Sequence, residues 1–238
     1  MANETVFYTA YPIVDNIVCL DETESAHCVR VLRYKNGDDI LLINGIGDII
    51  KGTVADANSK KCVINVSSVS SAPNAGTNLH VAIAPTKQND RLEWFIEKAV
   101  EIGISEITPI ICEYSERRKT NPQRLQKILI SACKQSLRPW FPTINDEIKF
   151  KDFIINNVNH SQKLIAYIDD EPLPHISETI QPGEDLLVII GPEGDFSPDE
   201  INFAKQHGYK LVSLGDARLR TETAALYATA TFNIINHK

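Results

Sequence analysis

Two glycine-containing segments near the end of the chain carry residue types that could bind a charged ligand. The first, IIGPEGDFSPDE, spans residues 189–200, and the second, SLGDARLRTETAA, spans residues 213–225. Each follows an apolar run and precedes a helix signal, and ligands bind α/β sheets beyond the carboxyl ends of strands. Gly191 and Gly194 would let the backbone approach a ligand closely. A plain strand-to-helix turn explains the first segment equally, and its spacing is not the G-x-G-x-x-G of dinucleotide sites.

The second segment places charged residues beside the start of the last helix. Thr221 is predicted to cap that helix, so Glu222 would lie in its first turn, where the helix dipole favours a carboxylate. Helix stabilisation is therefore one role for Glu222, and proton transfer is the other. Arg218 and Arg220 would suit an anionic ligand or substrate at the same place.

Alternating strand and helix patterns must position these segments. Buried strands are predicted at residues 79–85, 107–112, 163–169, 186–191 and 210–215. Helices are predicted over residues 90–102, after the Asn121-Pro122 pair, after Ser197 and at the end of the chain. Ser197 is the expected N-cap, followed by Pro198 in the first turn and Glu200 as the capping-box partner. This order predicts an α/β domain with a mainly parallel sheet.

The first part of the chain has a different pattern. Short strands are predicted over residues 38–45, 48–56 and 60–69, and one helix over residues 22–32, with Asp21 as its N-cap and Glu24 in a capping box. Short strands around one helix suggest a small barrel. Residues 70–78 are rich in Ser, Asn, Gly and Pro and are predicted to form a linker. We therefore expect two domains, residues 1–71 and 72–238.

The formal net charge of −7 argues against a protein that coats nucleic acid indiscriminately. Residues 114–138, however, contain Glu116 as their only acid. The basic residues of this stretch are Arg117, Arg118, Lys119, Arg124, Lys127, Lys134 and Arg138. A selective phosphate contact and an ordinary solvated helix face both explain such a cluster.

Other residue types narrow the function class. The five cysteines form no C-x-x-C pair and are predicted to be reduced core residues, and the six histidines form no H-x-x-x-H pair, so no metal site is expected. No apolar run is long enough for a membrane span, and residues 1–15 do not resemble a signal peptide, so a cytoplasmic protein is expected.

The motifs together resemble the RsmE family of ribosomal RNA uracil-N3 methyltransferases, within the SPOUT (trefoil-knot) superfamily. The resemblance rests on GPEG at residues 191–194, LGDARLRTETAA at 214–225, KQNDRLEWFIEKAVEIGISEITPI at 87–110, YSERR at 114–118 and KQS at 134–136. HCVRVLRYKNGDDI at residues 27–40 resembles the PUA-like RNA-binding domain of that family. The resemblance covers nearly the whole chain. The chain departs from it at Asp195, where the family usually has Gly, in LGDARLR, where it usually has L-G-x-R-I-L-R, and at Cys133-Lys134, where it often has Ala-Glu.

The resemblance implies a fold, an activity and an assembly. The fold is a PUA-like β-barrel followed by an α/β SPOUT domain with a mainly parallel sheet and a C-terminal knot. The activity is methylation of N3 of one uridine in 16S (small-subunit) ribosomal RNA with S-adenosyl-L-methionine, by a homodimer whose interface includes the last helix. The implied cofactor-binding residues are Tyr167, Gly191, Glu193, Gly194, Leu214, Gly215, Leu219 and Thr221.

The chemistry requires help for a weak nucleophile, because N3 of uracil carries a proton at neutral pH. Arg220 is the candidate that stabilises the developing anion on the base, with its side chain at the pocket mouth, and Glu222 is the candidate base. Bracing of the loops is the competing role for Arg220. The target base must be flexible or flipped out of a helix to reach the pocket.

RNA contacts are expected at basic residues of both domains: Arg30, Arg33, Lys35, Lys87, Arg91, Arg117 and Arg118. Arg30, Arg33 and Lys35 could equally be charges favoured at a helix end. Two other functions remain open. One is methylation of another RNA, and the other is a non-catalytic RNA-binding assembly factor, which Asp195 alone favours. A nicotinamide dehydrogenase lacks the required glycine pattern.

Overall fold

The chain forms two compact units in a computed structural model that describes residues 5–74, 76–157 and 160–237. The first unit consists of Met1–Asn74 and Ile130–Phe141, and the second of Ala75–Leu129 and Pro142–Lys238. The predicted linker, residues 70–78, overlaps the strand Val63–Ser71 at its first two residues, and its residue Ala75 lies outside the described part of the chain. Residues 1–4 of the segment 1–15, predicted not to be a signal peptide, also lie outside it. No helix in the described part of the chain is both long enough and apolar enough to cross a bilayer.

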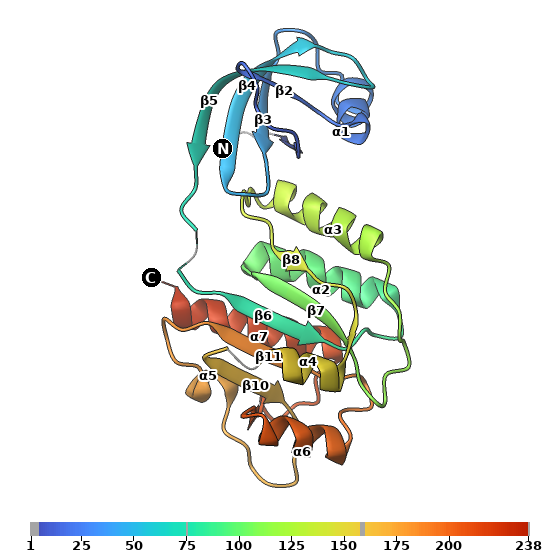
Figure 1. The fold of residues 1–238 in the computed structure, drawn as a ribbon, viewed down its shortest axis with the longest axis vertical. Helices are drawn as coiled ribbons and strands as arrows, with labels where there is room; N and C mark the ends of the chain where they lie inside the picture. Colours follow the sequence, from blue (N-terminus) through green and yellow to red (C-terminus); the bar gives the residue numbers. More distant parts are fainter. Residues whose placement is uncertain (1–4, 75, 158–159, 238) are drawn as a thin grey trace. The chain divides into compact units, whose positions relative to one another are not determined.

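The first unit is built on a curled five-stranded sheet with the order β1-β3-β4-β5-β2 (Figure 1). Its strands are β1 (Val6–Tyr8), β2 (Ile17–Cys19), β3 (Asp39–Ile43), β4 (Asp48–Asp56) and β5 (Val63–Ser71). Only β1 pairs in parallel, with β3, and the other pairs are antiparallel. Alternate residues of these strands, such as Leu42, Ile50 and Ile64, are buried in one core. The predicted β-rich unit is confirmed.

The early helix begins as predicted but changes geometry. Asp21 caps α1 (Glu22–Ala26) by accepting a 2.8 Å hydrogen bond from the Glu24 amide, and a π-helix (His27–Val31) continues it. The second half of the predicted capping box is wrong. The Glu24 carboxylate instead accepts a hydrogen bond from the Tyr8 amide at 3.0 Å and pairs with Lys134.

The second unit contains a parallel sheet with the order β12-β10-β11-β6-β7-β8, and β9 also pairs with β7. Its strands are β6 (Leu79–Ile83), β7 (Glu106–Ile111), β8 (Thr143–Ile144), β9 (Ile148–Lys149), β10 (Gln162–Ala166), β11 (Leu186–Ile190) and β12 (Lys210–Val212). Every pair that the structure gives for these strands is parallel. All residues of β6 and β11 are buried, because helices cover both faces of the sheet.

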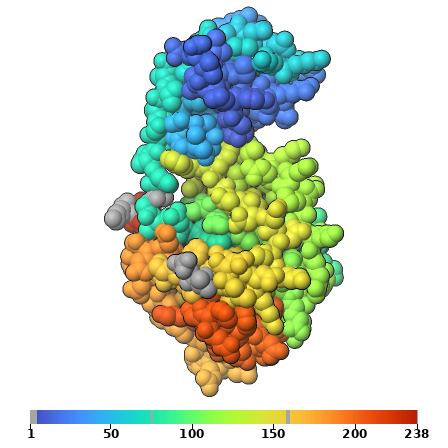
Figure 2. All heavy atoms as spheres, viewed as in Figure 1, coloured from blue at the N-terminus to red at the C-terminus, as the bar shows by residue number. Residues whose placement is uncertain are grey.

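The helices of this unit are α2 (Asn89–Ile102), α3 (Pro122–Gln135), α4 (Phe150–Asn156), α5 (Ile176–Thr179), α6 (Pro198–Gln206) and α7 (Thr221–Asn236). On one face of the sheet, α7 packs against β6, β11 and α2. On the other face, α4 and α6 enclose a core with Leu187 and Ile189. Figure 2 shows α4 (yellow) beside α6 (red-orange) on the surface. The predicted α/β class with a mainly parallel sheet is confirmed.

The segment Ile130–Phe141 packs with the first unit, although α3 begins in the second. The Trp140 ring lies over Gly47, where an added Cβ would come within 2.4 Å of it. The Trp140 indole donates a 2.9 Å hydrogen bond to the Ala72 carbonyl. Lys134 donates to Glu24 at 2.6 Å, and both side chains are mostly buried. Lys134 is therefore a structural residue of the first unit rather than part of an exposed basic face.

Replacing Lys134 by Met should destabilise the first unit by about 2 kcal/mol, because it leaves the mostly buried Glu24 carboxylate without its partner. The measurement is urea unfolding followed by fluorescence of Trp140, in a Trp94→Phe background that removes the other of the two tryptophans. Lys127→Met is the matched control, since Lys127 is exposed on the same helix and should change stability by no more than about 0.5 kcal/mol. Equal unfolding midpoints for the two variants would contradict this role of Lys134.

Candidate functional site

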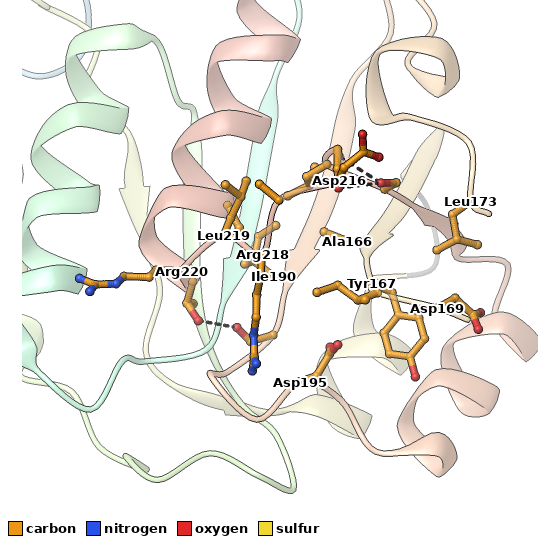
Figure 3. Close-up of a pocket in the computed structure, with 18 of the residues that line it drawn as sticks. Ala166, Tyr167, Asp169, Leu173, Ile190, Asp195, Asp216, Arg218, Leu219 and Arg220 are labelled. Carbon is orange, nitrogen blue, oxygen red and sulfur yellow. Dashed lines mark hydrogen bonds between the residues drawn. The ribbon is translucent and has the colours of Figure 1, made fainter. Parts of the chain in front are cut away.

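A pocket of about 930 Å³ opens at the carboxyl ends of β10, β11 and β12. Three segments of the second unit line it, one after each strand, as Figure 3 shows. They comprise residues 166–173, 190–195 and 213–221, with Ala224 of α7 added. Parallel strands end at the same edge of a sheet, so three segments far apart in the sequence meet there.

The segment after β10 supplies one aromatic residue and a run of three acids. The Tyr167 amide donates a 3.1 Å hydrogen bond to the Val212 carbonyl, which continues the pairing of β10 with β12. Burial raises the pKa of the Tyr167 hydroxyl, and nearby carboxylates raise it further. Asp169, Asp170 and Glu171 follow and are exposed. Tyr167 was a predicted cofactor residue, whereas Glu171 and Leu173 were not predicted.

The segment after β11 is held by internal contacts. An added Cβ on Gly191 would lie 2.8 Å from the Phe196 ring, so glycine is required here for packing. The Glu193 carboxylate accepts a 3.1 Å hydrogen bond from the Lys87 amide. Gly191 and Glu193 line the pocket, but Gly194 is not among the lining residues and faces Tyr114 instead. Both glycines are thus closely packed within the chain, and the approach of the backbone to a ligand stays a prediction for Gly191.

Asp195 lies in a backbone conformation that usually favours glycine, with φ of 62°. Its Oδ1 accepts a 2.9 Å hydrogen bond from the Phe196 amide, which holds the turn. Figure 3 shows its carboxylate pointing into the pocket, between Tyr167 and Arg218. Burial raises the pKa of the Asp195 carboxyl, and the Arg218 charge lowers it less. Asp195 thus occupies a left-handed turn of the kind that glycine also adopts, and its predicted effect on loop geometry stays a prediction.

The segment after β12 carries the glycine that its backbone needs. Gly215 has φ of 107°, and its amide donates a 3.0 Å hydrogen bond to Ser213 Oγ. The Thr221 hydroxyl donates at 3.1 Å to the Gly191 carbonyl, which joins this segment to the one after β11. The N-cap of α7 is Arg220, and Thr221 is already helical, so the predicted cap at Thr221 is wrong. The hydroxyl is used between segments instead of within the helix.

The lining of the pocket is strongly acidic. Its charged residues are Asp169, Asp170, Glu171, Glu193, Asp195, Asp216, Arg218 and Arg220. Six carboxylates against two guanidinium groups give a formal charge of −4. Apolar atoms of Leu173, Ile190 and Leu219 line it as well. This combination suits a ligand that has both an apolar ring system and a positive charge.

The two predicted catalytic residues lie away from the centre of the pocket. Arg220 contributes to the lining, but its exposed side chain points away from Tyr167 and Asp195 toward α2, as Figure 3 shows. The predicted orientation into the pocket mouth is therefore wrong. Glu222 is buried against α2, with its Oε1 at 3.8 Å from Arg91 Nε, and its Oε2 has no hydrogen-bond partner in the described part of the chain. Glu222 does not line the pocket.

The predicted RNA-binding residues fall into both units. In the second unit, Lys87 pairs with Glu116 at 2.9 Å, and the Arg117 and Arg118 side chains donate to the carbonyls of Lys87 and Glu113. In the first unit, Arg30, Arg33 and Lys35 are exposed at the end of the π-helix. The basic stretch over residues 114–138 is therefore not one surface, since Arg124 also pairs with Glu93 and Lys134 with Glu24.

Comparisons with known proteins agree with this architecture. Residues 73–233 match the family model of the RNA methyltransferase domain, and residues 20–67 match that of the RNA methyltransferase PUA domain. The chain is 32% identical over 216 residues to ribosomal RNA small subunit methyltransferase E of Rickettsia conorii, an alignment that covers 88% of this chain and 86% of that protein.

Solved structures extend the similarity to the whole fold. A probable rRNA-methyltransferase from Porphyromonas gingivalis is 39% identical with a TM-score of 0.89, covering 98% of both chains. Ribosomal RNA small subunit methyltransferase E from Neisseria gonorrhoeae, solved bound to S-adenosyl methionine, is 25% identical with a TM-score of 0.88, again covering 98% of both chains. The chain therefore belongs to the RNA methyltransferase family that includes the ribosomal RNA small subunit methyltransferase E proteins, with a PUA domain before the methyltransferase domain.

Proposed function

We propose that the chain methylates N3 of one uridine in 16S (small-subunit) ribosomal RNA, using S-adenosyl-L-methionine. The observation that carries the proposal is the acidic pocket at the ends of β10, β11 and β12. It lies in a chain whose relatives are named as small-subunit methyltransferases, one of them solved with this cofactor.

The residues of the pocket fit this cofactor in size and charge. A volume of about 930 Å³ is large enough for a nucleoside joined to an amino acid. Leu173, Ile190 and Leu219 offer apolar surface for an aromatic base, and the carboxylates offer counter-charge for a cation. When bound, S-adenosyl-L-methionine supplies a methyl group activated by a positively charged sulfur.

The loops that line the pocket need contacts within the chain that hold them in place when no cofactor is bound. The Thr221 hydroxyl and one oxygen of the Glu193 carboxylate form hydrogen bonds within the chain, so these two lining residues also fix the loops. Backbone groups around Gly191, Leu214 and Gly215 and the Tyr167 side chain remain for ligand contact. We keep these residues, with Leu219 for apolar contact, as the proposed cofactor-binding set. Glu193 and Thr221 are assigned to holding the loops, and Gly194 is removed because it does not line the pocket.

The nucleophile needs a group that stabilises negative charge on the uracil ring as N3 loses its proton. Arg220 is exposed and points away from Tyr167 and Asp195, which supports a role toward an incoming RNA base rather than toward the cofactor. Its planar guanidinium matches the two carbonyl oxygens of a uracil anion. Glu222 faces Arg91 and is buried, which favours a role in holding α7 against α2 over a role as the base.

RNA is proposed to contact both units. Arg30, Arg33 and Lys35 present charge in the PUA domain, and Arg117 and Arg118 keep free guanidinium donors after their bonds to backbone carbonyls. Phosphate contacts by these residues would position the RNA without reading its sequence. Of the two alternatives, methylation of a different RNA and a non-catalytic assembly factor, the second need not bind the cofactor. A cytoplasmic location remains a prediction.

The activity is tested by incubating purified protein with unmodified small-subunit ribosomal RNA, free and in the subunit, together with the cofactor. Mass spectrometry of the digested RNA should find one N3-methyluridine per molecule. Gly215→Val is the control variant, since its φ of 107° is strained for a side chain and the change should abolish transfer. Methylation of another base or another RNA would replace the proposed specificity, and cofactor binding without any transfer would favour the assembly factor.

Arg220→Ala should lower the single-turnover rate of methylation by roughly 10²- to 10³-fold while leaving cofactor affinity within about twofold, because a preorganised donor to the uracil anion is lost. Arg220→Lys keeps the charge but not the planar fork, so it should recover only part of the rate. Calorimetry measures cofactor affinity in parallel. A wild-type rate for Arg220→Ala would remove the catalytic role, and loss of cofactor binding together with early melting would assign Arg220 to bracing the loops.

A homodimer is proposed to form through α7 and the adjoining α2. These two helices pack together and leave apolar side chains exposed: Trp94 at 42%, Ile102 at 39%, Tyr227 at 39% and Ile234 at 75%. Ile234→Asp should therefore shift sedimentation at micromolar concentration from dimer toward monomer. Ile155→Asp, on the exposed face of α4, is the matched control and should stay dimeric. A wild-type protein that sediments as a monomer and is fully active would refute the proposal.

A further inference from the structure

The charge of the pocket affects the relative affinities for the cofactor and for the product that remains after methyl transfer. During transfer the sulfur–methyl bond breaks and its electron pair stays on sulfur, while a bond forms from N3 to the methyl carbon and the N3 proton leaves to solvent. The cofactor thereby changes from a sulfonium cation to a neutral thioether. The two molecules differ by one methyl group and one unit of positive charge.

Among the carboxylates of the lining, Asp195 is the best placed to interact with this positive charge. It is partly buried, points into the pocket, and forms no ion pair within the described residues. Arg218, its neighbour in Figure 3, donates a hydrogen bond to the Glu193 carbonyl. Arg218 offsets the Asp195 charge in part without forming an ion pair with it. In a partly desolvated site an added cation interacts with such a carboxylate more strongly than in water.

The turn at Asp195 does not require a negative charge. Its φ of 62° is open to glycine and, among other residues, mainly to Asn and Asp. The hydrogen bond from the Phe196 amide uses Oδ1, and an asparagine could make the same bond. Asparagine would lack the negative charge and the second carboxylate oxygen, and the Ile168 amide also bonds to the carboxylate.

Three further carboxylates, those of Asp169, Asp170 and Glu171, line the pocket from the segment after β10. They are exposed, so water and salt screen each of them more than Asp195. Together they add to a negative potential that attracts a cation into the pocket and leaves a neutral ligand unaffected.

We infer that Asp195, supported by the carboxylates at residues 169–171, makes the pocket discriminate by charge between the sulfonium cofactor and the neutral thioether product. The inference rests on the proposed function, because it assumes that this cofactor binds here. Its consequence is that methyl transfer itself weakens binding of the spent cofactor and promotes its exchange.

The test compares calorimetric affinities for S-adenosyl-L-methionine and S-adenosylhomocysteine in the wild type, Asp195→Asn and the control Asp152→Asn. Asp152 is an exposed acid on α4 that does not line the pocket, so its variant has the same change in net charge. Asp195→Asn should weaken binding of the charged ligand by about three- to tenfold and leave binding of the neutral ligand within about twofold. Asp152→Asn should change neither.

Two results separate the inference from the proposed function. Equal weakening of both ligands, or no weakening of either, by Asp195→Asn overturns charge discrimination while leaving the cofactor site intact. A wild-type protein that binds neither ligand overturns the proposed function itself. If Asp195→Asn melts early, the variant Asp169→Asn/Asp170→Asn/Glu171→Gln carries the test, with Asp146→Asn/Asp152→Asn/Glu184→Gln, all exposed and outside the pocket, as its matched control. The first triple variant should selectively weaken the charged ligand, and an unchanged affinity ratio between the two ligands contradicts the inference.

Discussion

The parallel pairing of β10 with β11 and β12 is the constraint on which the site depends. Ala166 is the last residue of β10 and pairs with Ile190 and Val212, the last residues of its two neighbours. Because the three strands end in register, the segments that follow must share one edge of the sheet. The hydrogen bond from Thr221 to the Gly191 carbonyl then fixes two of these segments to each other. A pocket results from residues that are separated by up to 58 positions in the sequence, from Ala166 to Ala224.

The negative charge of this pocket acts in opposite directions on a cationic cofactor and on an RNA backbone. A formal charge of −4 favours a cationic cofactor and disfavours phosphate groups. Under the proposed function, basic residues elsewhere, such as Arg117 and Arg118, would contact the RNA backbone, and a single base would enter the pocket. This division agrees with the need to take a base out of its stack before its ring atoms can react. The outward direction of Arg220 is compatible with the proposed role at an incoming base, because its guanidinium points away from Tyr167 and Asp195.

The sequence predicted the elements better than the side-chain roles. Local sequence signals predicted helix ends correctly where a single residue forms the end: Ser197 caps α6 in a complete capping box, and Gly103 ends α2 with φ of 132°. The predictions were wrong where a side chain could bond either to its own helix or to a residue distant in the sequence. Thr221 bonds to Gly191 rather than capping its own helix, and Glu24 pairs with Lys134, which is 110 positions away. Such choices depend on tertiary contacts, which no local pattern contains. The acids at residues 169–171 were visible in the sequence, but only the pairing of β10 brings them to the pocket.

If the three segments after β10, β11 and β12 form one cofactor site, all three must respond when the cofactor binds. Hydrogen–deuterium exchange with and without S-adenosyl-L-methionine measures this response, because it reports on each backbone segment separately. We expect slower exchange upon binding in residues 166–173, 190–195 and 213–221 together, with β3 and β4 of the first unit unchanged. Protection of only one of these segments, or protection confined to the first unit, would contradict it.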